Sequence, residues 1–294
     1  MALPRLIFVT GKGGTGKSTI AAALALALAR HRPVSLADLD RRLSAARLLG
    51  ASLDDANSTH ISAHINETLE VLALAPRAEL EAFIGRIVPI RAVARRMLKS
   101  RTFGFVTAAL PGLEAFLMLE RLRLMADEAA KKDRFVVVDG PASGNALELL
   151  SVARGIKQLA PLGTLNRLAV GVEEFLTDAS RCGVLITLLP EELALREALE
   201  AITTVREKLG LSCVAAALNC VPSALFTKAE MARVQPLGAH ARLAERRRAS
   251  AEFASMARER LAGIDVVELP MLFRSSLGQK ELVELGRKLV AALL

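Results

Sequence analysis

The chain has 294 residues, of which 52% are hydrophobic and only 3% aromatic, with neither Trp nor Tyr. This length and this apolar content allow a full α/β core made of aliphatic side chains. The scarcity of aromatic rings argues against a surface that stacks the bases of single-stranded nucleic acid. A formal net charge of +8 permits attraction to anionic partners without identifying one. The three cysteines are too scattered for a disulfide framework or a Cys-x-x-Cys metal site, which fits a reducing compartment.

The first predicted element, over residues 6–19, is an apolar strand that runs into a Gly-rich turn and then into an Ala/Leu helix. The turn contains the complete pattern Gly11-x-x-x-x-Gly16-Lys17-Ser18, in the strand–loop–helix context that a phosphate-binding loop (P-loop) requires. Its glycines let successive N–H groups point at one phosphate, and the helix N-terminus adds partial positive charge. Lys17 can then reach the β- and γ-phosphates, and Ser18 can ligate Mg²⁺. The sequence predicts a nucleoside triphosphate site made of Gly11, Lys12, Gly13, Gly14, Thr15, Gly16, Lys17, Ser18 and Thr19.

Lys12 is a second lysine, at the first variable position of this loop. The stretch Lys-Gly-Gly-Thr-Gly-Lys-Ser resembles the deviant Walker A motif of P-loop ATPases such as MinD, ParA, the nitrogenase iron protein and ArsA. The resemblance implies that Lys12 acts in catalysis together with Lys17, by reaching across a dimer to the partner's nucleotide. Positive charge placed there would stabilise negative charge in the transition state. A solvated surface lysine is the alternative interpretation.

The second predicted strand, residues 34–37, runs into Asp38-Leu39-Asp40. An acidic residue just past a strand end, beside a P-loop, can position an attacking water or organise the Mg²⁺ shell. This Asp-x-Asp resembles the start of switch I in the deviant Walker A group, which implies that Asp40 is catalytic and contributes to the metal site. For Asp38, capping of the following helix stays an open alternative.

A strand over residues 71–75 comes next, and no strand pattern occurs between it and Asp133. We interpret residues 76–133 as an α-helical subdomain inserted in the nucleotide-binding domain. Its unusually apolar part, residues 102–124, would either line a groove for a partner's apolar helix or form the insertion's own core. Helical patterns separated by prolines fill the insertion, at residues 77–87, 91–99 and 113–131.

The strand predicted at residues 135–138 ends in Asp139, which has the form of a Walker B acid, an apolar strand followed by a carboxylate on the magnesium side. We therefore place Asp139 in the metal site, with an ordinary strand-end residue as the alternative. Residues 140–147 form a predicted loop of Gly, Pro and small residues. Such a loop can sense the γ-phosphate, because loss of that phosphate releases it.

The remaining elements predict the fold class. Strands that alternate with helices and are apolar on both faces indicate an α/β fold, a mostly parallel sheet flanked by helices. Ligands of such sheets lie at the carboxyl ends of the strands, where the P-loop already is. We predict a single P-loop ATPase domain over residues 1–294, with the insertion at residues 76–133 and a second helical excursion at residues 238–262. The later strands and helices are expected at residues 184–188, 193–209, 214–218, 264–269 and 279–293.

The sequence also suggests a compartment. No secretory signal is visible, because the N-terminus runs directly into the first strand. The longest uncharged stretch, residues 209–227, has the length of a membrane span. It contains Asn219 and Pro222, so we interpret it as a buried strand plus loop. We expect a cytoplasmic protein.

With these elements placed, the chain resembles the ArsA family of anion-transporting ATPases, which includes the guided-entry ATPases that target tail-anchored membrane proteins. Residues 139–147, Asp-Gly-Pro-Ala-Ser-Gly-Asn-Ala-Leu, are similar to that family's switch II sequence Asp-Thr-Ala-Pro-Thr-Gly-His-Thr-Leu. Residues 187–193, with Glu197, resemble its later strand-to-helix segment. The resemblance implies a P-loop NTPase fold, ATP as the substrate and Mg²⁺ as the cofactor.

The same resemblance implies adenine contacts at Asn219, through its side-chain amide, and at Pro270. The helices over residues 77–131 lie where the family keeps its client-binding subdomain. Residues 40–44 read Asp-Arg-Arg-Leu-Ser where the family's switch I reads Asp-Pro-Ala-His-Asn-Leu-Ser, which predicts slow hydrolysis. The family's arsenite-binding cysteines, and the zinc-binding Cys-x-x-Cys of its eukaryotic guided-entry members, are absent. Their absence argues against metalloid transport and predicts a dimer without zinc at that position.

We favour a cytoplasmic ATPase that captures and releases a protein client. One P-loop per chain requires a second ATPase subunit, identical or a paralogue, if Lys12 is to act. A ParA- or MinD-like ATPase whose ATP dimer binds DNA or membrane is the second hypothesis. The basic residues between Arg86 and Arg101 and the amphipathic residues 279–294 motivate it, although a solvated helix face and a terminal helix on the sheet explain them equally. The third is a weakly catalytic subunit of a heterodimer, suggested by the altered switch I.

Overall fold

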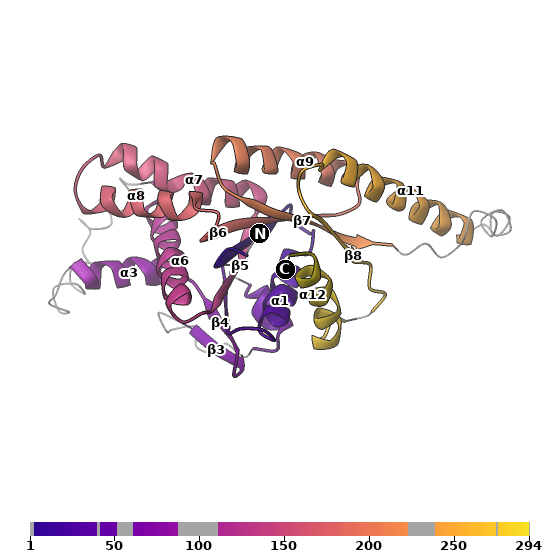
Figure 1. The fold of residues 1–294 in the computed structure, drawn as a ribbon, viewed down its shortest axis with the longest axis horizontal. Coiled ribbons are helices and arrows are strands. Elements are labelled where there is room, and N and C mark those ends of the chain that lie inside the picture. The colour runs from indigo at the N-terminus through magenta and orange to yellow at the C-terminus, as the bar shows by residue number, and fades with distance from the viewer. Residues whose placement is uncertain are drawn as a thin grey trace.

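The strands of the described part of the chain form one eight-stranded sheet (Figure 1). The computed structural model describes residues 3–39, 42–51, 61–87, 111–222, 239–274 and 276–293. The strand order is β3-β4-β2-β5-β1-β6-β7-β8. The bounds are β1 Leu6–Gly11, β2 Val34–Asp38, β3 Ile61–Asn66, β4 Leu69–Ala73, β5 Phe135–Ala142, β6 Cys182–Leu188, β7 Cys213–Val221 and β8 Val266–Pro270.

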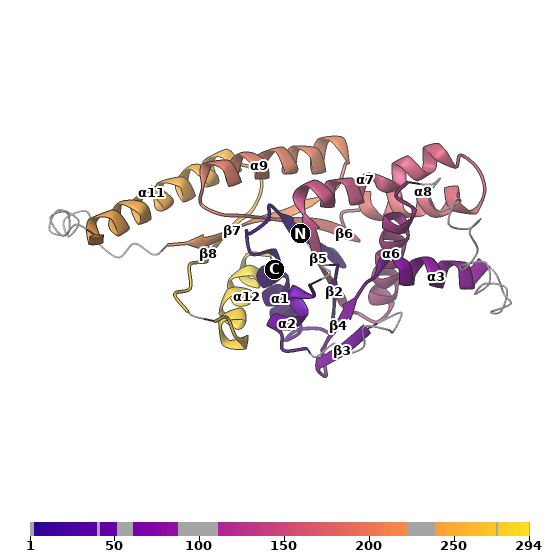
Figure 2. The same cartoon turned by 180° about the vertical axis from the view of Figure 1, so that it is seen from behind.

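Helices cover both faces of the sheet, as the two opposite views show (Figures 1 and 2). Their bounds are α1 Lys17–Leu28, α2 Ser44–Leu48, α3 Pro76–Ile87, α6 Leu113–Lys131, α7 Ser143–Leu159, α8 Thr164–Thr177, α9 Glu192–Thr203, the π-helical turn η1 Thr204–Lys208, α11 Ala239–Arg260 and α12 Gln279–Leu293. Within the described part of the chain, no helix is both long and apolar enough to cross a bilayer.

Every strand pair of the sheet is parallel except β3–β4. Strands β1, β2 and β6 are buried along their whole length, because helices cover both of their faces. The predicted fold class, a mostly parallel sheet flanked by helices, is therefore confirmed. The sequence does not predict β3, because this edge strand carries the exposed polar residues Ser62, His64 and Asn66 in place of an apolar run.

The side chains of β1 alternate between the two layers of the core. Leu6 and Phe8 join the hydrophobic cluster formed with α6, α7, α8 and α9, and Ile7 joins the cluster formed with α1 and α12. Helices α1 and α12 approach closely at Gly286, where a Cβ would collide with the backbone oxygen of Ala23. Helix α12 buries its apolar side chains in this contact. The amphipathic face that a MinD-like membrane tail would use is thus part of the core.

The segment after Asp139 differs from the prediction. The prediction of a loop at residues 140–147 is wrong, because β5 continues to Ala142 and α7 begins at Ser143. Parallel pairing with β1 holds this extension, since Ala142 lies opposite Gly11. A Cβ at Gly140 would collide with the ring of Phe8, so only glycine allows this close approach.

Other boundaries agree more closely. The predicted helices at residues 113–131 and 279–293 have the bounds of α6 and α12. The helix expected at residues 193–209 is divided into α9 and η1. The strand expected at residues 71–75 begins two residues earlier, as β4. The uncharged stretch at residues 209–227 contains β7, as predicted, and its last five residues lie outside the described part.

Helices α3 and α6 are the described part of residues 76–133. Helix α6 contacts β5, α7 and α8 as well as α3, and its Phe116 shares a hydrophobic cluster with Phe8 of the sheet. It therefore covers the sheet directly. Residues 88–110 lie outside the described part, with the predicted helix at 91–99 and most of the basic run. The inserted subdomain and its client groove stay predictions. In the region of the second predicted excursion, α11 extends past the β8 edge of the sheet (Figures 1 and 2).

Candidate functional site

The P-loop joins the end of β1 to the start of α1, and three of its four glycines occupy positions that other residues would not fit. Gly14 and Gly16 have φ angles of +86° and +87°, in the left-handed region that favours glycine. A Cβ at Gly11 would collide with the backbone oxygen of Thr187, and one at Gly16 with the side-chain amide of Asn219. The loop therefore lies directly against the carboxyl ends of β6 and β7.

Two buried polar side chains hold the loop from these strand ends. The hydroxyl of Thr187, on β6, lies 2.6 Å from the hydroxyl of Thr15. Thr15 Oγ1 also donates to the carbonyl oxygen of Lys12, at 2.9 Å. Asn219, on β7, donates its Nδ2 to the carbonyl oxygen of Thr15, again at 2.9 Å. Buried hydrogen bonds of this kind fix the backbone in one conformation before any ligand arrives.

The two P-loop lysines have partners within the chain. Lys17 Nζ donates to the carbonyl oxygen of Lys12, at 3.2 Å. Lys12 Nζ lies 2.7 Å from Oε1 of Glu197, which α9 presents beside the loop. Both partners of this ion pair are half-buried. In the single chain Lys12 is therefore not a fully solvated surface lysine, and its role toward a partner's nucleotide stays a prediction.

Two aspartates lie side by side on β2 and β5, and β5 is the neighbour of the P-loop strand β1. The parallel register places Asp38 of β2 opposite Asp139 of β5, and Asp139 opposite Val9 of β1. Both aspartates are fully buried. Asp38 Oδ2 accepts a hydrogen bond from the backbone N–H of Ala46, at 3.2 Å, so it caps α2 as the alternative interpretation had it. Asp40 lies outside the described residues.

Residues 140–142, by which β5 continues after Asp139, are hydrogen-bonded to β1. Thr10 Oγ1 donates to the carbonyl oxygen of Pro141, at 2.8 Å. This bond and the β1–β5 pairing hold the segment that resembles switch II as strand in the single chain. Asp139 therefore lies on a strand that hydrogen bonds hold directly against the P-loop strand.

A cavity of about 760 Å³ opens beside the P-loop at Gly14. Cys220 and Met271 line this cavity, and they directly follow Asn219 and Pro270 in the sequence. Burial raises the pKa of the Cys220 thiol, which keeps it protonated and a weak nucleophile at neutral pH. The walls are the start of α9, the ends of β7 and β8, and α11, and the lining residues are Gly14, Leu189, Pro190, Glu191, Glu192, Cys220, Pro222, Arg247, Ala249, Ser250, Phe253, Met271 and Phe273.

Comparison with known sequences agrees with this geometry. The sequence model of the anion-transporting ATPase family, ArsA, matches residues 4–168, more than half of the chain. The chain belongs to this family. The matched residues include the P-loop, Asp38 and Asp139. The family is one of ATPases.

Individual relatives of this ArsA-family chain come from mycobacteria. ATPase BagA of Mycobacterium tuberculosis is 33% identical over 205 residues, which cover 67% of this chain and 60% of the relative. The Mycobacterium bovis protein named "Putative ATPase Mb3704" has the same identity and coverage. The chain thus spans about 60% of the length of the relatives it matches.

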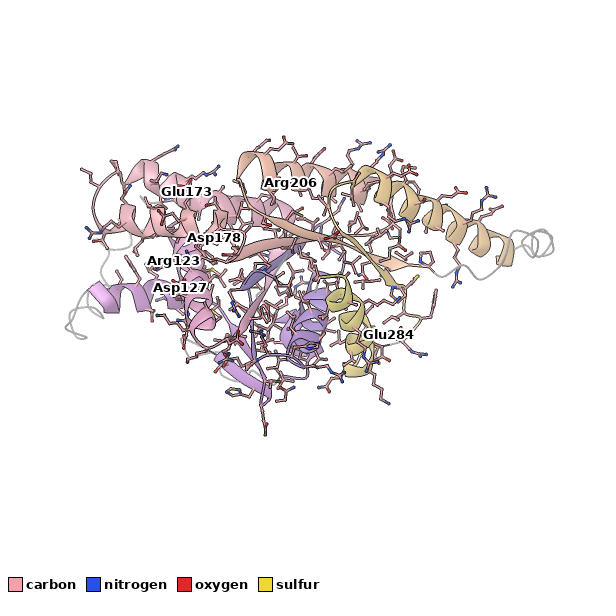
Figure 3. The ribbon with its side chains drawn as sticks, in the orientation of Figure 1. Arg123, Asp127, Glu173, Asp178, Arg206 and Glu284 are labelled. Atoms are coloured by element: carbon pink, nitrogen blue, oxygen red, sulfur yellow. The ribbon has the colours of Figure 1, made fainter. Side chains whose placement is uncertain are left out.

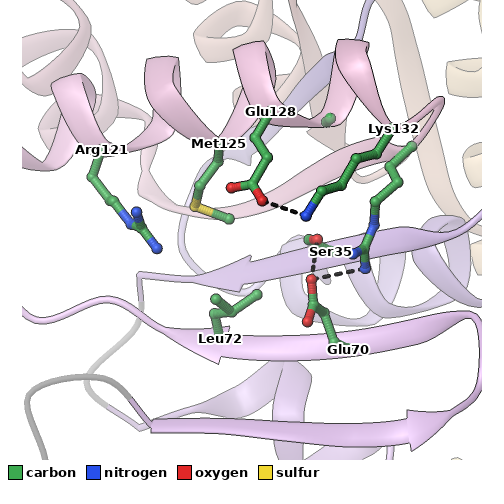
Figure 4. Close-up of a pocket in the computed structure, with 9 residues that line it drawn as sticks. Ser35, Glu70, Leu72, Arg121, Met125, Glu128 and Lys132 are labelled. Atoms are coloured by element: carbon green, nitrogen blue, oxygen red, sulfur yellow. Dashed lines mark hydrogen bonds and ion pairs between the residues drawn. The ribbon is translucent and has the colours of Figure 1, made fainter.

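A second cavity, of about 70 Å³, lies at the opposite end of the strands, where β2 and β4 begin (Figure 4). Glu70 accepts hydrogen bonds there from Ser35 Oγ, at 2.5 Å, and from Arg134, at 2.8 Å. Glu128 pairs with Lys132 at 2.6 Å, and this hydrogen bond lowers the pKa of the Glu128 carboxyl. The charges of this cavity are largely matched among its own residues, and it lies away from the P-loop.

Arg123, another group with a shifted pKa, belongs to an ion-pair network on α6. Figure 3 labels Arg123 and Asp127 on α6, on the far side of the molecule from α11. A hydrogen bond with Glu120 raises the pKa of Arg123, and Asp127 bridges Arg123 and Arg181 at 2.9 and 2.6 Å. This ion-pair network joins α6 to the start of β6, which is a structural role.

Sequence reasoning missed two contacts of the site. Thr187 enters the sequence analysis only through a family resemblance, and its hydrogen bond to Thr15 joins residues 172 positions apart. The Lys12–Glu197 pair joins residues 185 positions apart. Both depend on β6 lying beside β1, which no local pattern specifies. A polar residue at the end of an otherwise apolar strand is the signal that points to Thr187.

Proposed function

We propose that this chain is a Mg²⁺-dependent ATPase in which ATP binding pairs two subunits, and hydrolysis separates them to time the capture and release of a protein client. The complete P-loop carries this proposal, because its shape is fixed by buried contacts from β6 and β7 before a ligand binds. Such a loop presents backbone N–H groups and the N-terminus of α1 to a phosphate chain. The family assignment supports ATP as the substrate.

The oxygen donors near the P-loop suit magnesium. Ser18, in the first turn of α1, offers a hydroxyl, and Asp139, on β5 opposite Val9 of the P-loop strand, offers a carboxylate. Mg²⁺ prefers such hard oxygen ligands and is usually held by one or two carboxylates together with substrate phosphates. When bound, the ion neutralises charge on the phosphates. We assign Ser18, Asp139 and Asp40 to this shell, and to Asp40 the orientation of the attacking water.

Asn219 supports adenine as the base. One N–H of its amide group donates to the carbonyl oxygen of Thr15 in the P-loop, which leaves Oδ1 and the second N–H to meet a base. That oxygen only accepts hydrogen bonds. It suits the N6 amino group of adenine, and the second N–H suits the ring nitrogen N7 beside it, whereas guanine presents two acceptors, O6 and N7, at these positions. Pro270, at the end of β8, pairs in register with Val221, two residues beyond Asn219, and would border the same base.

Pairing of two chains would change the partner of Lys12. In the single chain its ammonium group is held by Glu197. When two P-loops face each other across bound ATP, the phosphates of the partner's nucleotide offer more negative charge than one carboxylate. We propose that Lys12 exchanges Glu197 for those phosphates, and that the second subunit is another copy of this chain or a paralogue.

The client and the compartment rest on the family resemblance. We assign client capture to the helices of residues 76–133, of which α3 and α6 are described, and we place the protein in the cytoplasm. DNA or membrane binding is the competing proposal. Its membrane form lacks support from α12, because the apolar side chains of α12 are buried against α1 and β8.

The test combines hydrolysis with mass. The full chain should release phosphate from Mg-ATP, Lys17→Ala should not, and a non-hydrolysable ATP analogue should double the mass of the wild type or recruit a second ATPase. Lys12→Ala should bind ATP yet fail to pair. ATP-dependent and salt-sensitive DNA binding would favour the competing proposal. Phosphate release equal in wild type and Lys17→Ala would refute the ATPase assignment.

A further inference from the structure

We propose that Arg247 and Phe273 together form a platform for the nucleoside part of ATP, with Arg247 supplied from α11 as a nucleotide-binding residue. This inference rests on the proposed function, since it names a further contact of the same site. Neither residue belongs to the P-loop or to the strand ends that carry Asn219 and Asp139. The sequence motifs do not indicate either of them.

The two side chains are stacked. The guanidinium carbon of Arg247 lies 4.6 Å from the centre of the Phe273 ring, within the range of a cation–π contact. Phe273 is nevertheless 57% exposed. The ring is therefore covered on the side of Arg247 and open elsewhere. An exposed aromatic ring held next to a cation can stack a further planar group.

The guanidinium also has unused donor capacity. Arg247 Nη1 is fully buried and, among the described residues, has no hydrogen-bond partner. A buried donor without an acceptor is uncommon in folded proteins, because it loses its hydrogen bonds to water without replacement. A ligand that brings an acceptor close to this side chain would remove that cost after a small movement of the guanidinium. Ring nitrogens of a purine and hydroxyls of a ribose are such acceptors.

The position of the pair selects the ligand. Arg247 and Phe273 line the cavity of about 760 Å³ that also reaches Gly14 of the P-loop. The rest of its wall is mainly apolar, with Pro222, Phe253 and Met271. A mainly apolar cavity with a few polar groups suits a flat heterocycle better than a phosphate chain. Because the cavity is continuous with the P-loop, one molecule can place phosphates in the loop and a nucleoside on the platform.

The neighbouring Arg248 gives a matched control. It lies next to Arg247 on α11, but its side chain is 73% exposed and pairs with Glu252 on the same helix, at 2.9 Å. It is not among the residues that line the cavity. The variants Arg247→Ala and Arg248→Ala therefore remove the same charge from the same helix, one at the cavity and one in solvent.

The experiment measures the affinities of the full chain for Mg-ATP and for Mg-tripolyphosphate, which has the phosphates without the nucleoside. Arg247→Ala should weaken ATP binding by about tenfold, in the range of a partly desolvated cation–π contact, and should leave tripolyphosphate affinity unchanged. Arg248→Ala should change neither. Phe273→Ala should resemble Arg247→Ala, and the double variant should lose less than the product of the two single losses.

Two results would overturn the platform. ATP affinity of Arg247→Ala equal to the wild type shows that the side chain does not meet the nucleotide. Equal losses for ATP and tripolyphosphate show that Arg247 meets phosphates or acts only through the fold. Failure of the proposed function has a different signature, because the wild type would then bind neither ligand.

Discussion

The ammonium group of Lys12 lies 2.7 Å from the carboxylate of Glu197 in the same chain. Lys12 follows β1 and Glu197 lies on α9, which follows β6, so the pair exists because β1 and β6 are neighbours. The family resemblance assigns this lysine to a partner's nucleotide, but in the single chain it forms an intrachain ion pair. Any pairing that uses Lys12 in trans has to break this contact first.

Removing the Glu197 carboxylate should favour pairing. Glu197→Gln releases Lys12 and should lower the concentration at which a non-hydrolysable ATP analogue pairs the chain. The shift should be about twofold to fivefold, since half-exposed ion pairs contribute little. Sedimentation velocity over a concentration series measures it. Glu200→Gln is the control, because Glu200 is an exposed carboxylate on the same helix. Weaker pairing in Glu197→Gln would show that Glu197 itself belongs to the interface.

Thr187 should affect nucleotide binding without touching the ligand. Thr187→Val keeps the side-chain shape and removes the buried hydroxyl that lies 2.6 Å from Thr15 Oγ1. A lost buried hydrogen bond costs about 1–3 kcal/mol. Part of this cost should appear as ATP affinity that is weaker by about threefold to tenfold, because the loop is less well held. Competition with a fluorescent ATP analogue measures it. Unchanged affinity would mean that the β6 contact does not shape the loop.

Asp139 should be required for hydrolysis and Asp133 should not. Asp139 lies within β5 and Asp133 lies just before its start, so the pair compares two carboxylates of one segment. Asp139→Asn should lower kcat by about 100-fold or more, as expected when a group that stabilises transition-state charge is removed. Asp133→Asn should leave kcat unchanged, because Asp133 pairs with Arg5 and Arg32 near the other end of β5. The rate of phosphate release at saturating Mg-ATP measures kcat. Near-normal turnover by Asp139→Asn would show that Asp139 does not belong to the metal site.

Acid should destabilise the fold partly through Glu173. A hydrogen bond from Lys157, with further help from Arg154, lowers the pKa of Glu173 from 4.5. A carboxyl whose folded pKa is depressed stabilises the fold above its unfolded pKa, and this contribution is lost as pH falls through the folded pKa. The wild type should therefore lose more stability than Glu173→Gln between neutral pH and the range below 4.5.

Urea unfolding at several pH values tests this linkage. Glu174→Gln is the control, since Glu174 is the exposed neighbour on α8. It should show the pH dependence of the wild type. If Glu173→Gln and the wild type lose stability in parallel on acidification, the ion pairs with Lys157 and Arg154 do not contribute to the folded state.

Two glycine-to-alanine changes should have opposite effects. At Gly286 a Cβ would collide with the backbone oxygen of Ala23, so Gly286→Ala should destabilise the fold by about 1–3 kcal/mol. At Gly171 of α8 the nearest atom is 4.0 Å away. Gly171→Ala should be neutral or stabilising by up to about 1 kcal/mol, through helix propensity. Thermal unfolding compares the two, and equal effects would contradict the close approach of α1 and α12.

Local patterns in the sequence were sufficient for the P-loop, the fold class and long helices such as α6 and α12. Apolar runs, glycine spacing and helical periodicity encode these features directly. The sequence could not predict β3, whose polar edge carries no apolar run, or the continuation of β5 through Gly140 and Pro141, which depends on pairing with β1. The contacts of Glu197 with Lys12 and of Thr187 with Thr15 could not be predicted for the same reason. Their contacts follow from strand order, and strand order is a property of the whole sheet.

Binding of a nucleoside triphosphate in the P-loop underlies the proposed function. Calorimetric titration of Mg-ATP into the full chain measures this binding. The wild type should show saturable binding, and Lys17→Ala should bind about tenfold to 100-fold more weakly, the range for one lost hydrogen bond to a charged group. A wild-type chain with no saturable heat of binding, or a Lys17→Ala variant that binds ATP as tightly as the wild type, would contradict the account.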